Sequence, residues 1–442
     1  MKQIAEALVQ RCRALGARGA EAYVKTGERR AVELSPDGVV SFTRSAEGGI
    51  GLRVLRDAGA AGFASICGPH PGDDALEHLA HAALDAARAP GTAFALPGAG
   101  ATRDGRGLGI FDPRLHAATP ADLEGLLGDA AREALRADPR VRRVDAAALA
   151  VSSSRVTIRN SEGFDGEYRQ TIVNLSLGAV AQDAGRSIIV RQSRTARNFS
   201  AFSPALFGDQ TARLALTALE GGPMKGCLTP ALLAPAAAAE VLRHFARNIL
   251  LAGATPGARV ASQRVTIVDD GHLPGGAASA PFDGEGIATR RTTVVSRGQV
   301  EARLHDLESA AREGASSTGN GIRVSFREPP SRATSNLFIA PGSEDPDELM
   351  AALRDGVLVE SLRPTTALRA ERGVFAGIAT GRRVVSGIPH EPVAGALLVA
   401  PLSDLLHGVT GVGNDLTFGF PGGSFAAPSL LVKEIEIRAP WA

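Results

Sequence analysis

The stretch DDGHLPGGAASAPFDGEG, residues 269–286, follows directly after the β-type run RVTIV at 264–268. It contains five glycines and two prolines, and this spacing cannot hold a helix. Glycine allows positive φ angles and the close approach of another backbone, so a glycine-rich loop that leaves a strand can form the floor of a groove. The sequence therefore predicts an ordered loop around which the C-terminal half of the chain is built.

Titratable side chains are concentrated in the same loop. Asp269, Asp270, Asp283 and Glu285 supply carboxylates, and His272 supplies an imidazole. Such a set is compatible with a metal site or with acid/base chemistry. It is equally compatible with an acidic connection, because loops collect aspartate and glycine for reasons of turn geometry alone. Both interpretations stay open at this point.

Three further motifs follow the loop in a fixed order. They are STGN at 317–320, VGNDL at 412–416 and APSLLV at 427–432. Together with the loop they resemble the TldD/PmbA family, and more narrowly its PmbA, or TldE, branch. The resemblance extends to DGVVSF at 37–42 and GIGLRV at 49–54, which are similar to the opening strands of that family, so it covers nearly the whole chain.

The resemblance implies a peptidase system in which a TldD-type subunit binds zinc through a helix bearing His-Glu-x-x-x-His. In that motif the imidazoles hold the metal and the glutamate activates a metal-bound water. The best match in this sequence is APAAAA at 234–239. Alanine stands at both ligand positions and proline at the position of the base, and alanine has no lone pair to donate. We therefore expect neither catalytic nor metal-binding residues in this chain, and zinc only in a partner. Glu240 and His244, four residues apart, are interpreted as a helix-surface pair.

The resemblance also implies a function. We expect a non-catalytic, zinc-free subunit that pairs with a TldD-type catalytic subunit in a heterodimer and encloses a cleft for unfolded or short peptides. The candidates for lining that cleft or contacting the partner are the polar residues of the family motifs: Asp269, Asp270, His272, Asp283, Glu285, Asn320, Asn414 and Asp415. Their alternative role is to determine turns of the fold.

Three other functions remain possible on the sequence alone. The chain could be a maturation factor for a peptide-derived natural product, or a homodimeric peptide-binding protein without catalysis. A metal-free hydrolase that uses carboxylates of the central loop would need raised pKa values in a dry pocket. A serine hydrolase is not indicated, because the sequence contains no G-x-S-x-G motif.

Composition indicates a globular cytoplasmic protein. The chain has 442 residues, 44% of them hydrophobic and 21% charged, and a net charge of +1, which favours neither nucleic acid nor an anionic membrane. Three widely spaced cysteines, Cys12, Cys67 and Cys227, predict no disulfide framework. The N-terminus lacks the apolar run of a signal peptide, and no stretch reaches the roughly 18 apolar residues of a membrane span.

Hydrophobic periodicity predicts an α+β protein in which N-terminal lobes, each a helix plus an antiparallel meander, precede a mostly β C-terminal domain. We expect an α+β lobe at 1–110, a second at 111–222, and the domain that carries the family motifs at 223–442. Short strands are predicted at 21–26, 30–34, 39–44 and 50–55. Helices are predicted to start at Thr119 and Asp345, each followed by proline and an acid. A hairpin is expected across Thr380-Gly381, joining 373–379 to 382–386.

Overall fold

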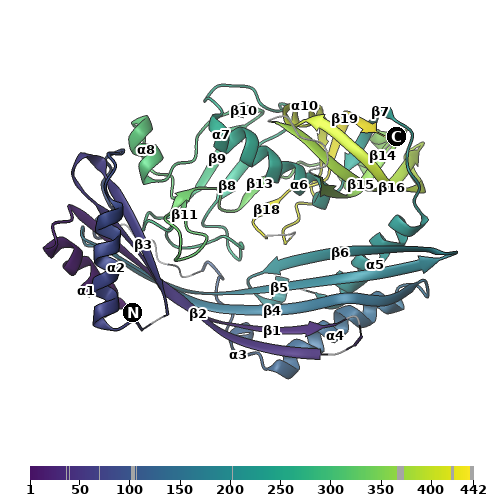
Figure 1. The fold of residues 1–442 in the computed structure, drawn as a ribbon. Coiled ribbons are helices and arrows are strands. Elements are labelled where there is room, and N and C mark those ends of the chain that lie inside the picture. Colours follow the sequence, from purple (N-terminus) through teal and green to yellow (C-terminus); the bar gives the residue numbers. More distant parts are fainter. Residues whose placement is uncertain are drawn as a thin grey trace.

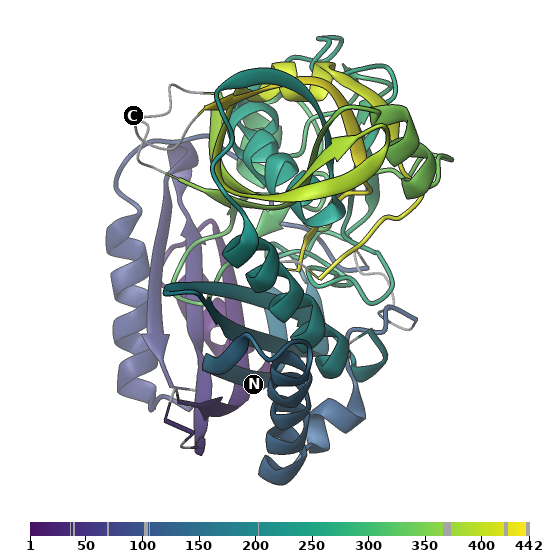
Figure 2. The same cartoon turned by 90° about the vertical axis from the view of Figure 1, so that its right-hand side faces the viewer.

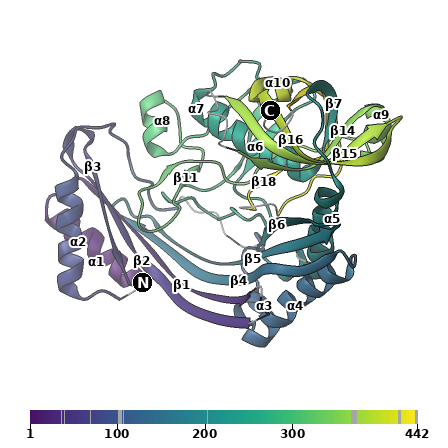
Figure 3. The same cartoon turned by 45° about the vertical axis from the view of Figure 1, so that its right-hand side comes forward.

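A curved six-stranded antiparallel sheet forms the N-terminal half of the protein, in the order β3-β2-β1-β4-β5-β6. The computed structural model describes residues 1–35, 37–38, 40–68, 70–100, 105, 107–201, 203–365, 373–419 and 423–438. The sheet lies beneath the C-terminal half and curves around it (Figures 1 and 3). Its strands are β1 (Gly19–Leu34), β2 (Val40–Leu55), β3 (Ala61–Cys67), β4 (Val141–Asn160), β5 (Asp165–Asp183) and β6 (Arg186–Ala196).

The first two strands are longer than the sequence pattern predicts. We expected breaks near Gly27 and Glu47, but β1 pairs with β2 without interruption and with β4 along most of its length. These pairings provide hydrogen-bond partners for the backbone at both positions. The hydrogen bonds of the sheet outweigh the local preference for a turn. At Gly27 the neighbouring strand lies so close that a Cβ would sit 2.6 Å from the carbonyl oxygen of Ser153.

Two pairs of helices cover this sheet. α1 (Lys2–Ala14) and α2 (Asp73–Ala86) pack near one end, and α4 (Pro120–Arg136) and α5 (Pro204–Glu220) near the other, each over its own apolar core. The predicted start of α4 is confirmed, since Thr119 and Asp122 form a reciprocal capping box. Strands from both predicted N-terminal lobes share one sheet, and the boundaries at 110 and 222 stay predictions. Shorter elements are η1 (Asp57–Gly59), α3 (Pro113–Ala117) and η2 (Phe199–Ala201).

A closed barrel of five strands dominates the C-terminal half. The strands pair in the order β16-β15-β14-β7-β19, and residues 436–438 of β19 pair back to β16, while β17 pairs with residues 430–432 on the same edge of β19. Figure 2 shows the barrel as a ring beside the N-terminal sheet. The strands are β7 (Cys227–Leu233), β14 (Gly356–Pro364), β15 (Val374–Val385), β16 (Ile388–Pro401), β17 (Val409–Val412) and β19 (Leu430–Arg438).

The hairpin expected across Thr380-Gly381 is wrong. These residues lie inside the single strand β15, and the chain turns at Ser386 and Gly387, both of which have positive φ. Gly381 is needed where β14 bulges, because a Cβ there would lie 1.9 Å from the carbonyl oxygen of Leu358. A glycine that permits close backbone approach within a strand thus resembled a turn residue in the sequence.

A second, smaller sheet packs beside the barrel and carries the central loop. Its order is β10-β9-β8-β13-β18, and the loop at 269–286 leaves β8. The remaining elements of this half are β8 (Ile267–Asp270), β9 (Arg291–Ser296), β10 (Gln299–Val300), β11 (Gly321–Ile322), β12 (Ser331–Arg332), β13 (Leu337–Ile339), β18 (Phe425–Ala426), α6 (Pro235–Phe245), η3 (Ala246–Leu250), α7 (Leu251–Gly253), α8 (Leu307–Glu313), α9 (Pro346–Leu353) and α10 (Leu402–His407). The α+β class, with a largely β C-terminal half, is therefore confirmed.

Three simpler predictions can be compared with the structure. Cys12 is buried, Cys67 and Cys227 are exposed, and all three thiols are free. Within the described ranges no helix is both long enough and apolar enough to cross a bilayer. The capping box predicted at Asp345 is present at the start of α9.

Candidate functional site

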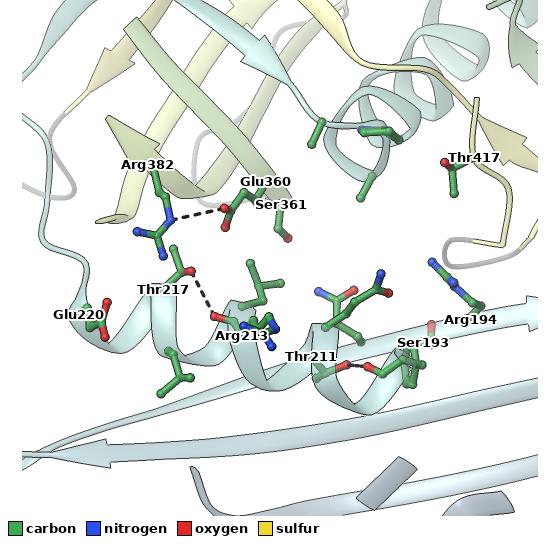
Figure 4. A pocket seen from close by; sticks show the side chains of 18 of the residues that line it. Ser193, Arg194, Thr211, Arg213, Thr217, Glu220, Glu360, Ser361, Arg382 and Thr417 are labelled. Atoms are coloured by element: carbon green, nitrogen blue, oxygen red, sulfur yellow. Dashed lines mark hydrogen bonds and ion pairs between the residues drawn. The ribbon is translucent and has the colours of Figure 1, made fainter. Parts of the chain in front are cut away.

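A groove runs between the N-terminal sheet and the C-terminal barrel. It consists of two adjoining cavities of about 570 and 710 Å³, which share Gln192, Leu214, Ala236 and Ser361 as wall residues. One wall comes from β6 and α5, and the other from the first turns of α6 and from β14, β15 and β16. Figure 4 shows the first cavity with side chains from both walls pointing into it.

The first turn of α6 reaches the groove with small apolar groups. Pro235 at the first helical position fixes the φ angle that starts the helix. The buried stripe of Val241, Leu242 and Phe245 anchors the other face in the core of the C-terminal half. As a result Ala234, Pro235 and Ala239 all line the groove. These are the three positions that the sequence comparison predicts to correspond to the two histidines and the glutamate of the His-Glu-x-x-x-His motif.

Glu240 directly follows Ala239 on α6 and contacts His244, which lies one turn further along. The imidazole Nδ1 lies 3.2 Å from Oε1 of Glu240, and Arg243 binds the same carboxylate. Burial tends to raise the pKa of Glu240, but hydrogen bonds from His244 and Arg243 lower it overall. His244 also packs edge-to-face on Phe375. The carboxylate of Glu240 therefore already has Arg243 and His244 as partners. The described ranges contain no group of three His, Cys, Asp or Glu side chains that could hold a metal ion.

Glu360 of β14 is a half-buried carboxylate in the groove wall. Burial raises the pKa of its side chain, and Arg382, at 3.8 Å, and the hydroxyl of Thr217 act in the opposite direction. Figure 4 shows Arg382 extending from the barrel toward Glu360 above α5. Glu360 was not among the residues predicted from the sequence. Its only signal is a lone acid in the apolar strand GVLVESL at 356–362.

β6 forms the free edge of the N-terminal sheet where that sheet meets the groove. Thr195 donates its N–H outward, to the carbonyl oxygen of Gly419 at 3.0 Å. Backbone groups of a strand alternate in direction, so those of Ser187, Ile189, Arg191 and Ser193 point to the same outer side. None of these four has a backbone partner there among the described residues. An uncovered strand edge thus borders the groove.

The central loop lies elsewhere, packed against the N-terminal sheet. Its Glu285 is buried. The carboxylate accepts a hydrogen bond from the guanidinium of Arg53 on β2 at 2.6 Å and another from the backbone N–H of Leu307 at 2.7 Å. Arg53 also binds Glu21 of β1 at 3.0 Å, and Arg323 binds the second oxygen of Glu21. This set of two glutamates and two arginines, the interdomain charge network, is almost completely shielded from solvent.

Asp283 holds the shape of the loop itself. One carboxylate oxygen accepts the N–H groups of Glu285 and Ile287, and the other accepts the N–H of Gly321. Burial and the charge of Glu285 raise its pKa, whereas the three backbone donors oppose the rise. Burial likewise raises the pKa of Glu285, with Arg53 opposing it. Both side chains are enclosed within this chain, so neither reaches a groove or an outer surface.

Asp269 and Asn320 form a second buried cluster behind the loop. Asp269 accepts hydrogen bonds from Asn320 Nδ2, Ser335 Oγ and Ser335 N, each at 2.7 Å. Burial raises the pKa of Asp269 to about 6 despite these donors. Asp270 binds the backbone N–H of His272 and contacts Arg291 at 3.4 Å. The Nδ1 atom of His272 is buried and has no hydrogen-bond partner among the described residues.

The raised pKa of Asp269 gives a testable dependence of stability on pH. The folded chain keeps a proton on Asp269 between about pH 4 and 6, where the unfolded chain has lost it, so the unfolding free energy falls as pH rises through this window. Asp269→Asn removes this titration. We expect the stability of the natural chain relative to the variant to drop by about 2–3 kcal/mol from pH 4 to 7 in urea unfolding. A pH-independent difference would contradict the assignment.

Asn414 and Asp415 lie apart from the loop, after β17. Asp415 accepts the backbone N–H of Ser429 at 2.8 Å and its hydroxyl at 2.7 Å, which ties the VGNDL and APSLLV motifs together. Asn414 is exposed and donates its N–H to the carbonyl oxygen of Glu344. The eight predicted residues therefore occupy three places, and none of them lines the groove. Their assignment to a peptide cleft or a partner contact stays a prediction.

Comparison with known proteins identifies relatives along most of the chain. Residues 20–87, 113–219 and 227–439 match family models described as PmbA/TldA metallopeptidase domain 1, central domain and C-terminal domain. The protein named Metalloprotease PmbA in Escherichia coli O157:H7 is 24% identical over 439 residues, which is 95% of this chain and 90% of that protein. A Methanocaldococcus jannaschii protein named as a metalloprotease is 35% identical over 107 residues, only 24% of either chain.

The fold has a close counterpart among solved structures. TldE from Thermococcus kodakarensis superimposes with a TM-score of 0.86, at 18% identity, over 99% of this chain and 100% of that one. Identity at this level shows a shared fold, and the family assignment rests on the three domain matches and on the nearly full-length relative. This chain belongs to the TldD/PmbA family of metallopeptidases.

Proposed function

We propose that this chain is a zinc-free, non-catalytic subunit that pairs with a TldD-type subunit in a metallopeptidase acting on unfolded or short peptides. The observation that carries the proposal is the lining of the groove by Ala234, Pro235 and Ala239. A family of metallopeptidases implies a metal, but methyl groups and a pyrrolidine ring donate no lone pair to zinc. The donor set at α6 therefore does not fit a zinc site, and no catalytic step is assigned to this chain.

The groove is suited to holding a peptide rather than cutting it. The uncovered edge of β6 offers backbone donors and acceptors at Ser187, Ile189, Arg191 and Ser193. An extended peptide that adds to a strand edge gains affinity from main-chain hydrogen bonds and needs no particular side chains. This mode suits a subunit that presents many different peptides to a catalytic partner.

The proposal is tested by native mass spectrometry and metal analysis of the purified chain, before and after mixing with a TldD-type protein of the same genome. We expect no stoichiometric zinc in the isolated chain, a one-to-one complex on mixing, and peptide cleavage only by the mixture. Stoichiometric zinc in the isolated chain, or cleavage by it, would refute the proposal. A homodimer that binds peptide and forms no complex with the TldD-type protein would support the alternative function of a peptide-binding protein without catalysis.

A substitution at the strand edge tests the binding mode. Ile189→Pro removes an outward N–H, and edge strands tolerate proline at such positions. We expect the complex with Ile189→Pro to lose about tenfold in kcat/KM for an unstructured peptide, because one backbone hydrogen bond is lost and the ring obstructs its neighbours. Ile189→Val keeps the N–H and is the matched control. Equal activity of the two variants would exclude peptide addition to β6.

A further inference from the structure

The groove is lined by an excess of positive charge. The described residues of its two cavities include seven arginines and three glutamates, with no lysine and no aspartate. The chain as a whole carries a net charge of only +1. Among the residues that line the groove, positive charge is therefore in excess. A cleft lined by one sign of charge attracts ligands of the opposite sign.

The three glutamates do not provide a free negative site, since each already contacts an arginine of the groove. Glu220 binds Arg140 at 2.8 Å, and Glu240 binds Arg243. The third contact, between Glu360 and Arg382, spans 3.8 Å. These contacts use three of the seven arginines and all of the acids that line the groove.

The remaining arginines lie on both walls. Arg191 and Arg213 pair with Asp145 and Asp209, which lie outside the groove lining. Arg363, exposed at the end of β14, makes no ion pair or hydrogen bond with another described side chain. Arg194 projects from β6 across the cavity from Arg382 (Figure 4), and burial lowers its pKa. Guanidinium groups bind carboxylates through paired hydrogen bonds.

We propose that the groove selects peptides by their carboxylates, with Arg363 as the principal contact on the barrel side. The carboxylate is supplied by an acidic side chain of an extended peptide or by its free C-terminus. The inference rests on the proposed peptide-holding function and gives it a substrate class. Main-chain pairing along β6 fixes the peptide, and the arginines bias which peptides are held.

The experiment measures the affinity of the full chain, in complex with its TldD-type partner, for four fluorescein-labelled octapeptides by fluorescence anisotropy. A catalytically silenced partner prevents cleavage during the measurement. The first peptide carries two glutamates and an amidated C-terminus, and the second has glutamine at both positions. The third is the glutamine peptide with a free carboxylate, and the fourth carries two lysines. The variant is Arg363→Gln, and the matched control is Arg312→Gln on α8, an exposed arginine outside the groove lining.

We expect the glutamate peptide to bind about tenfold more tightly than the glutamine peptide, and the lysine peptide to bind most weakly. Arg363→Gln should remove most of this preference, and Arg312→Gln should not change it. Tight binding of the third peptide would identify the C-terminus as a source of the carboxylate. Equal affinities for the glutamate and glutamine peptides, or a preference unchanged by Arg363→Gln, would overturn the inference and leave the peptide-holding function intact. Absence of binding for all four peptides would overturn both.

Discussion

Replacing Arg53 with methionine is expected to lower the free energy of unfolding by about 3–5 kcal/mol. Arg53 bridges Glu285 at 2.6 Å and Glu21 at 3.0 Å, and all three side chains are buried. Methionine fills a similar volume but leaves the carboxylate of Glu285 with only the backbone N–H of Leu307 as a partner. An uncompensated buried charge is costly because it has lost its water without gaining a counter-ion.

Urea unfolding followed by circular dichroism measures this loss. Arg44→Met is the matched control, since Arg44 and Glu28 form an ion pair on the same sheet whose members are 68% and 33% exposed. Its loss should stay below about 1 kcal/mol. Adding Glu285→Gln to Arg53→Met removes the orphaned charge and should recover part of the stability. If the single variant were as stable as the control, the interdomain charge network would not stabilise the fold.

Replacing Phe282 with alanine is expected to cost about 3–5 kcal/mol as well. Phe282 belongs to the central loop and is 2% exposed. It packs edge-to-face on Phe164, in the turn between β4 and β5, and on Tyr168 of β5, with ring centres 5.3 and 5.1 Å away. Gly166 makes room for the ring, because a Cβ there would lie 2.7 Å from it. Truncation opens a cavity at the contact between the two halves of the protein.

The same unfolding measurement tests this prediction. Phe42→Ala is the control, because Phe42 is a 43% exposed side chain of β2 and its loss should change stability by about 0.5 kcal/mol or less. We also expect Phe282→Ala to make the chain more sensitive to limited proteolysis, since the central loop loses its aromatic anchor. Equal stability of the two variants would show that the loop does not hold the halves together through Phe282.

Local signals in the sequence predict helix starts and loops well here. The capping boxes at Thr119 and Asp345 act within four residues, so their meaning does not depend on the rest of the fold. Strand length depends on distant partners, and the breaks predicted near Gly27 and Glu47 are absent because β1 pairs with both β2 and β4. Gly381 was wrongly predicted to lie in a turn for the same reason. The glycine is needed because the backbone of β14, distant in the sequence, approaches it closely.

The candidate site could be recognised only in part. The family motifs drew attention to the central loop, whose polar residues turn out to bind the loop and the N-terminal sheet. The interdomain charge network joins Glu21 to Arg323, which are 302 positions apart in the chain, so no local pattern reveals it. The groove combines β6, α6 and β14, and each contributes side chains that look ordinary in isolation. The resemblance singled out Ala234 and Ala239 only as positions without zinc ligands, and nothing in the sequence connected them with the groove.

The closed barrel has a consequence for the order in which the chain can fold during synthesis. All six strands of the N-terminal sheet lie before residue 197, so that sheet can assemble while the ribosome is still producing the remainder. β7 must wait, because its partners are β14 and β19, and Cys227 pairs with Ile437 close to the end of the described chain. A nascent chain released early would therefore expose an unpaired apolar β7 at both edges. We expect truncated translation products of this protein to be substrates for chaperones and proteases.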